Sequence, residues 1–264
     1  MEYNQVIMTS MYSTFGHRKK ITLVFSLFFL CILSLLLLPE QVLSWRSKPH
    51  IKMTEDAIKL IPKMPEENQI FAIYFSDLKA GILEPDKNRV IEHTNVAACA
   101  MMIDRLAKEC ERMIKNKEDW AKIMFTLGQA THYVEDLNTP FHCIKVKKNI
   151  HEEFEKVAVE GHWQEDSYKG FYYIKDYKVF AYNICNFCER YVPYIEKWYF
   201  KSDPELLKKM MVPLWANTVQ DIVDFWLTVF RNGFGEEKYK ELGLPEPVGI
   251  REEKEIKFEK IKDL

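Results

Sequence analysis

Apolar residues recur every three to four positions along most of the chain, the spacing of an amphipathic helix. This pattern predicts helices over residues 54–61, 67–80, 94–115, 118–137, 151–160, 174–198 and 204–231. Thr54 and Asp203 are candidate N-caps for the first and the last helix, and Gly81 is the expected end of the second. Phe171–Ile174 is the one candidate strand. The fold class predicted is all-α, a single-domain multi-helix bundle.

The predicted helix over residues 118–137 is two-sided. On a helical wheel of about 100° per residue, one side carries Trp120, Ile123, Leu127, Thr131 and Val134, and the opposite side carries Phe125, Gln129, His132 and Asp136. A helix with apolar residues on both sides lies at the centre of a bundle. Buried ionisable groups are costly unless they are paired or bound to metal, so this helix is a candidate for carrying a site.

The first 44 residues have the organisation of an export signal. Residues 18–20 are basic, residues 21–38 are almost wholly apolar, and Val42 and Ser44 fit the small-residue cleavage pattern. Cleavage after Ser44 would leave Trp45 as the new N-terminus. The alternative is an uncleaved membrane anchor over residues 21–38, because this run approaches the roughly 20 residues that span a bilayer. Either alternative predicts a secreted or extracytoplasmic domain.

Chain length and net charge limit the number of domains and the kinds of partner that the protein can bind. A chain of 264 residues with 47% hydrophobic residues supports one sizeable core. We assign it to residues 45–235 and expect residues 236–264 to be a loose polar tail. A net charge of -2 gives no electrostatic basis for non-specific nucleic-acid binding, so no stable nucleic-acid partner is expected. The oligomeric state cannot be predicted.

The cysteines are compatible with export but define no metal site. Five of the six lie beyond residue 44, so at most two intrachain disulfides can form there. Cys185 and Cys188 have a redox-like spacing inside a helical pattern. A single pair is a weak zinc motif, since a structural zinc ion needs four ligands. A local disulfide or two packed thiols is the favoured interpretation.

Potential metal ligands gather between residues 132 and 155. His132 and Asp136 are four residues apart, so both side chains project from one helix face. His142 follows Pro140, which must end or kink the helix. His151 and Glu155 form a second pair with the same spacing. One such pair alone is usually a surface ion pair, but two pairs with a histidine between them favour a zinc site, since imidazole and carboxylate are zinc ligands.

The sequence LGQATHYVEDLNTPFH, residues 127–142, resembles the hallmark motif of the zinc-dependent phospholipase C family. That family is in turn similar to single-strand-specific nucleases and 3′-nucleotidases. The resemblance implies an all-α domain with a trinuclear zinc site in its core. The implied metal ligands are Trp45, His50, Asp77, His93, His132, Asp136, His142, His151 and Glu155.

Two of these ligand assignments, Trp45 and Asp77, depend on signal cleavage and on the order of ligands in the family. Trp45 would bind zinc through a free amine and its carbonyl, which requires cleavage after Ser44. Asp77 competes with Asp86 and is favoured by the order of ligands in the family. His162 is the remaining histidine, for which a surface or packing role is expected.

The resemblance implies hydrolysis of a phosphodiester by metal-activated water, with phospholipid head groups as the substrate. Two metal ions can clamp both oxygens of an in-line displacement at phosphorus, and zinc lowers the pKa of bound water to about 7. Asp77 would orient or deprotonate the water, and up to three zinc ions would bind. A membrane surface is a possible partner.

Two other functions stay open at this point. The spacing of Trp45 and His50 is similar to the nuclease branch, whereas Glu155 resembles the phospholipase branch. A single-strand nuclease or 3′-nucleotidase-like phosphoesterase is therefore the first alternative. A non-catalytic zinc-binding exported domain is the second.

Overall fold

A computed structural model of the chain describes residues 43–61, 69–88, 95–144, 148–160, 163 and 168–252. The chain divides into two compact units, residues 1–44 and 45–264. The second unit contains every described element except the first two residues of helix α2. No helix within the described ranges is long and apolar enough to cross a membrane, and the apolar run over residues 21–38 lies outside them.

The second unit is helical, which confirms the predicted fold class. Its strands β1 (Tyr172–Tyr173) and β2 (Gly249–Ile250) form a short parallel pair. The helices are α2 (Leu43–Leu60), α3 (Ile70–Ile73), α4 (Phe75–Asn88), α5 (Val96–Lys115), α6 (Trp120–Leu137), α7 (Pro140–Cys143), α8 (Lys148–Glu160), α9 (Tyr177–Cys188), η2 of the 3-10 type (Glu189–Tyr191), α10 (Val192–Lys201), α11 (Pro204–Phe234) and α12 (Glu236–Glu241).

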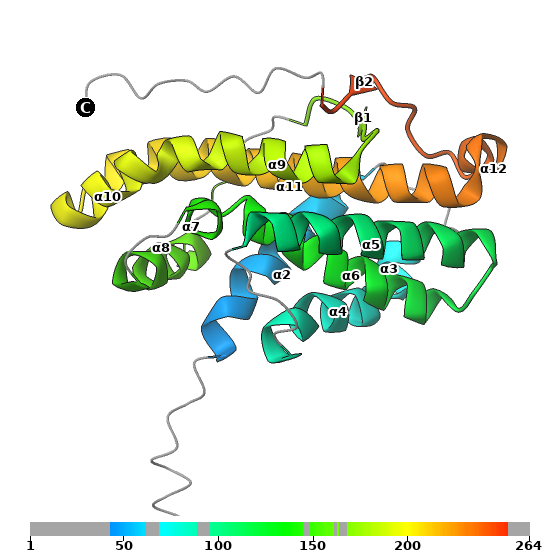
Figure 1. Ribbon diagram of the computed structural model, residues 1–264, viewed down its shortest axis with the longest axis horizontal. Coiled ribbons are helices and arrows are strands. Elements are labelled where there is room, and N and C mark those ends of the chain that lie inside the picture. Colours follow the sequence, from blue (N-terminus) through cyan, green and yellow to red (C-terminus); the bar gives the residue numbers. More distant parts are fainter. Residues whose placement is uncertain are drawn as a thin grey trace, which may run out of the picture. The chain divides into compact units, whose positions relative to one another are not determined.

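Helix α6 is the central helix predicted from its two-sided pattern. It lies beside α4 and α5, and the long helix α11 packs on it as well (Figure 1). Nearly all its side chains from Ile123 onward are buried, including His132 and Asp136. Trp226 of α11 donates a hydrogen bond from Nε1 to Thr131 Oγ1 at 2.8 Å. The motif-bearing helix is therefore covered on several sides.

Two glycines allow α4 and α6 to approach closely. A Cβ atom added at Gly81 would lie 1.9 Å from the carbonyl oxygen of Phe125, and one added at Gly128 would lie 2.2 Å from that of Leu78. The sequence pattern predicted that Gly81 ends a helix, but Gly81 lies inside α4. Its missing side chain is needed for helix packing rather than for a turn.

Other helix boundaries also differ from the prediction. Thr54 is not an N-cap but lies within α2, which begins at Leu43. The single helix expected over residues 174–198 is divided into α9 and α10 by the 3-10 turn η2, next to a proline at the start of α10. Asp203 caps α11 as predicted, since its side chain accepts hydrogen bonds from the amides of Glu205 and Leu206.

Residues 236–252, which were expected to be part of a loose tail, form regular structure and pack on the bundle. Helix α12 and strand β2 follow α11, and Tyr239 is fully buried. Arg251 is buried against Asp221 and Asp224 of α11. A buried cation between two buried carboxylates ties this segment to the bundle, because loss of either partner would leave an uncompensated buried charge.

Candidate metal centre

Asp136 lies among three imidazole rings. One carboxylate oxygen, Oδ1, is 3.5 Å from His50 Nε2 and 3.6 Å from His142 Nδ1. The other, Oδ2, is 3.2 Å from His132 Nε2. All four side chains are buried. The rings of His50 and His132 are 4.5 Å apart between centroids, so residues from α2, α6 and α7 converge on one carboxylate.

Asp86 of α4 joins this group. His50, Asp86 and His132 each offer a ligand atom, and these atoms all lie within 4.8 Å of one another. Asp77 lies in the first turn of α4, whereas Asp86 lies in its last turns. At 1.5 Å of rise per residue, the two positions are about 13 Å apart along the helix. The structure thus brings Asp86, rather than Asp77, to the histidines.

His142 and His151 form a second part of the site. Helix α6 ends before Pro140, as predicted, and Pro140 begins the short helix α7 that carries His142. The His142 and His151 rings are perpendicular, with centroids 4.9 Å apart. The ring of Phe141 lies 5.4 Å from that of His151. Two imidazoles thus lie next to each other, and one of them is also in contact with Asp136.

The donor set fits zinc. Two ligands that each lie about 2.1 Å from one tetrahedral ion are roughly 3.4 Å from each other. The separations between Asp136 and the three imidazoles fall around this value. Nitrogen and carboxylate donors without thiolate are the ligand types of catalytic zinc sites. Because it contacts three imidazoles, Asp136 would be a shared carboxylate ligand of the zinc centre.

Other residues of the predicted ligand set are not placed. His93 lies outside the described residues, as does the spare His162. The backbone of Trp45 lies in the first turn of α2, and that of Glu155 lies in α8, but their side chains are outside the described part of the structure. Their ligand roles stay predictions.

The sequence analysis missed Glu135, which precedes Asp136 on α6. Its carboxylate is fully buried and accepts hydrogen bonds from His50 Nδ1 at 2.9 Å and from Thr54 Oγ1 at 3.0 Å. The signal that could have drawn attention to it is a second carboxylate directly beside Asp136, on a helix predicted to be buried on both sides.

Burial and charge shift the pKa values in the metal-free site. Burial disfavours the charged form of His50, but the hydrogen bond and negative charge of Glu135, with the charge of Asp136, raise the pKa of His50 to about 9. Burial raises the pKa of Glu135 to about 7, opposed by His50. Burial lowers the pKa of His132, against the charge of Asp136. His132 is therefore held in the neutral form that binds metal.

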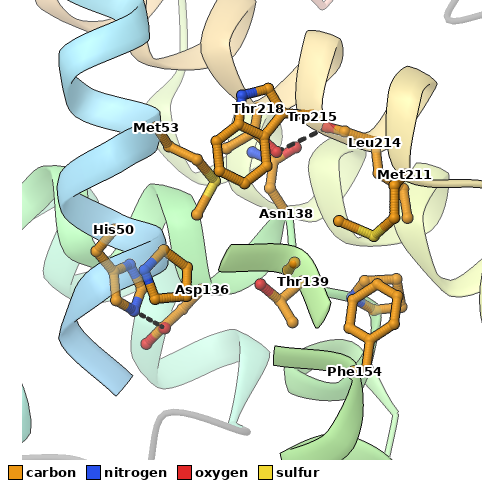
Figure 2. Close-up of a pocket in the computed structure, with 13 residues that line it drawn as sticks. His50, Met53, Asp136, Asn138, Thr139, Phe154, Met211, Leu214, Trp215 and Thr218 are labelled. Atoms are coloured by element: carbon orange, nitrogen blue, oxygen red, sulfur yellow. Dashed lines mark hydrogen bonds and ion pairs between the residues drawn. The ribbon is translucent and has the colours of Figure 1, made fainter. Parts of the chain in front are cut away.

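A pocket opens next to the cluster. Figure 2 shows His50 and Asp136 at one end, with Trp215, Leu214 and Met211 of α11 on the opposite wall. Most of its lining is apolar: Pro49, Met53, Pro140, Phe154, Ala158, Met211, Leu214 and Trp215. The polar lining residues other than His50 and Asp136 are Asn138, Thr139 and Thr218. The pocket thus joins a set of metal-binding groups to an apolar wall.

Disulfide pairing differs from the favoured interpretation of the two closely spaced cysteines. Cys185 is bonded to Cys143, which directly follows His142, while Cys188 is a buried free thiol. The bond ties α7 to α9 and so fixes the backbone next to a candidate ligand. No local disulfide forms within the helix.

Fold and site together define an all-α domain with a histidine and carboxylate metal centre in its core. The sequence model of the zinc-dependent phospholipase C family matches residues 49–234, and the chain belongs to this family. Among curated proteins, no sequence matches the chain significantly.

Solved structures of two clostridial toxins are similar to the chain. The alpha toxin from Clostridium absonum is 16% identical, with a TM-score of 0.51, and the match covers 73% of this chain and 65% of that one. The alpha-toxin of an avian strain of Clostridium perfringens is also 16% identical, with a TM-score of 0.44 and coverage of 74% and 64%. The chain therefore spans about 65% of the first toxin, and the likeness concerns the fold.

Proposed function

We propose that the chain is a zinc-dependent hydrolase of phosphate esters that cleaves phospholipid head groups, in the manner of a phospholipase C. The observation that carries the proposal is the contact of Asp136 with three imidazoles, with Asp86 beside two of them. Membership of the zinc-dependent phospholipase C family supports it independently.

Two groups of residues would hold the zinc ions. His50, Asp86 and His132 supply one set of ligands, together with one oxygen of Asp136. His142 and His151 supply a second, to which the predicted ligand Glu155 would add a carboxylate. Trp45 and His93 complete the set implied by the family. Bound zinc would supply a hydroxide near neutral pH and neutralise charge on the phosphate.

Asp86 takes the catalytic role that the sequence analysis gave to Asp77. Its carboxylate lies beside His50 and His132, so it can orient the attacking water and accept a proton from it. Asp77 is near the opposite end of the same helix. The buried Asp136 would hold the three imidazoles around it.

The apolar wall beside the cluster favours a phospholipid over a nucleotide. Met53, Phe154, Met211, Leu214 and Trp215 can take up the apolar part of an ester whose phosphate lies at His50 and Asp136. Trp215 is held in place, since its Nε1 donates to Asp56 Oδ2 at 3.0 Å. Because Phe154 and Trp215 are aromatic and can also stack on a base, assays on both substrate classes must separate the two alternatives.

We further propose that the protein works outside the cytoplasm, where it meets its substrate at a membrane surface. The disulfide between Cys143 and Cys185 supports this location, since such bonds persist in oxidising compartments. The signal-like organisation of the first 44 residues supports it as well.

Substrate assays on the purified mature protein test the proposal. We expect hydrolysis of phosphatidylcholine in mixed micelles, releasing phosphocholine, and little activity on single-stranded DNA or 3′-nucleotides. The His132→Ala variant should lose activity and melt at a lower temperature, because metal binding is coupled to folding. Faster cleavage of nucleotides than of lipid would favour the nuclease alternative. Full activity of the His132→Ala variant would refute the site.

A further inference from the structure

Glu135 is a buried carboxylate that the proposed reaction does not use. Its side chain is fully covered by protein, at a position of α6 that faces α2. An isolated ionised carboxylate at such depth is costly, so its partners decide what it does. Both partners lie on α2, one helical turn apart: His50 contacts Oε2 and Thr54 contacts Oε1.

The contact with His50 determines which ring nitrogen is available for metal. An ionised carboxylate can only accept hydrogen bonds, so His50 Nδ1 carries the proton and donates it to Glu135. The other nitrogen, Nε2, points to Asp136 Oδ1 at 3.5 Å, on the side of Asp86 and His132. A carboxylate partner on one ring nitrogen would thus fix the tautomer that offers the other nitrogen to a metal ion, and it would strengthen the ligand.

The contact with Thr54 determines the position of the carboxylate itself. Thr54 has no exposed surface, and its hydroxyl donates to the oxygen that His50 does not use. The carboxylate therefore cannot rotate away from His50 without losing a buried hydrogen bond.

We propose that Glu135 is a positioning residue of the metal centre, which holds His50 with Nε2 facing Asp86 and His132 and thereby strengthens zinc binding at that position. The proposal rests on the zinc centre inferred above but not on the identity of the substrate. The competing role is a purely structural tie between α2 and α6.

Zinc affinity, rather than activity, separates the two roles. The zinc-free protein is titrated with zinc against a chromophoric chelator, and the zinc content of each variant is counted by mass spectrometry. We expect Glu135→Gln to weaken the binding of one zinc ion per chain by about 10–100-fold, the range typical for the loss of such a partner. Glu135→Asp, which keeps the charge, should recover part of the lost zinc affinity. It replaces Glu135→Gln in the test if the glutamine variant does not fold.

A double-mutant cycle with His50→Ala shows whether Glu135 acts through His50. In the His50→Ala background, Glu135→Gln should cause no further loss of zinc affinity. Thr54→Val is the matched control, since it removes a hydrogen bond between the same two helices and leaves His50 in contact with Glu135. It should lower the melting temperature and weaken zinc binding less than Glu135→Gln does, because His50 keeps its partner.

Three outcomes would overturn the proposal. Unchanged zinc affinity in Glu135→Gln, with a lowered melting temperature, would leave only the structural tie. An equal loss of affinity with and without His50 would show that Glu135 does not act through it. Absence of zinc from the wild-type protein would remove the metal centre and the proposed function as well. Zinc binding without phosphoesterase activity would contradict the proposed function alone.

Discussion

Asp86 near the end of α4 and His132 in α6 bring a carboxylate and an imidazole ligand atom to within 4.8 Å of each other. The close approach of α4 and α6 at Gly81 and Gly128 makes this possible. Asp77, on the same helix as Asp86, lies about 13 Å further along its axis. Two carboxylates so far apart cannot bind the same ion.

The two aspartates therefore form a matched pair of variants. Asp86→Asn should lower kcat/KM at least 100-fold and reduce the zinc content, because it removes a ligand and the group next to the attacking water. Asp77→Asn should stay within about threefold of the wild type, as its side chain is half-buried and away from the cluster. Steady-state kinetics and a zinc count measure both, and the reverse order of effects would restore Asp77 as the catalytic residue.

The C-terminal segment is expected to stabilise the whole domain through Arg251. Replacement by methionine leaves Asp221 and Asp224 buried without their cation, which should cost about 3–5 kcal/mol of unfolding free energy. Arg112→Met is the control, because Arg112 is 48% exposed and exposed ion pairs such as those with Glu109 and Glu118 contribute little to stability. Urea denaturation compares the two, and equal losses would contradict a buried anchor at Arg251.

The disulfide beside His142 should stabilise both the fold and the second metal position. Cys143 and Cys185 are 42 residues apart, for which loop-closure entropy predicts up to about 4 kcal/mol. Replacing both by serine should lower the melting temperature and weaken zinc binding at His142 and His151. Reducing agent should have the same effect on the wild type and none on the double variant. Insensitivity of the oxidised wild type to reductant would argue against the bond.

The metal-free protein should show a pH-dependent contribution from His50. Its pKa is about 9 in the folded state, above the unfolded value near 6.5. A raised pKa means that the stabilisation is fully present below about pH 6.5 and is lost as the pH rises through 9. The difference in unfolding free energy between the wild type and His50→Gln, measured in chelator from pH 6 to 10, should therefore fall with rising pH. A difference that grows with pH would contradict the pairing with Glu135.

Local sequence patterns were sufficient for the main elements of the fold and for part of the site. The two-sided pattern of residues 118–137 predicted the central helix, and the spacing of His132, Asp136 and His142 predicted their convergence, because both depend on the geometry of one helix and the turn after it. The Asp203 cap was predicted for the same reason.

The errors concern contacts between segments that are distant in sequence. Gly81 was predicted as a helix end because the sequence does not show that it packs against the carbonyl of Phe125 in another helix. Thr54 was predicted as an N-cap because the sequence does not show that its hydroxyl bonds instead to Glu135, far along the chain. The assignment of Asp77 stays a prediction, but the position of Asp86 beside the histidines depends likewise on which end of α4 meets them. The position of each of these residues depends on packing between helices, which the pattern of residues along the chain does not reveal.

The zinc content of the purified mature chain tests the central claim most directly. Elemental analysis after exhaustive buffer exchange, combined with N-terminal sequencing, gives the number of ions per chain and the first residue. We predict at least two tightly bound zinc ions, and three if the chain begins at Trp45 with a free amine. Fewer than two zinc ions per chain in a folded protein would contradict a catalytic zinc centre at His50, Asp86, His132, Asp136 and His142.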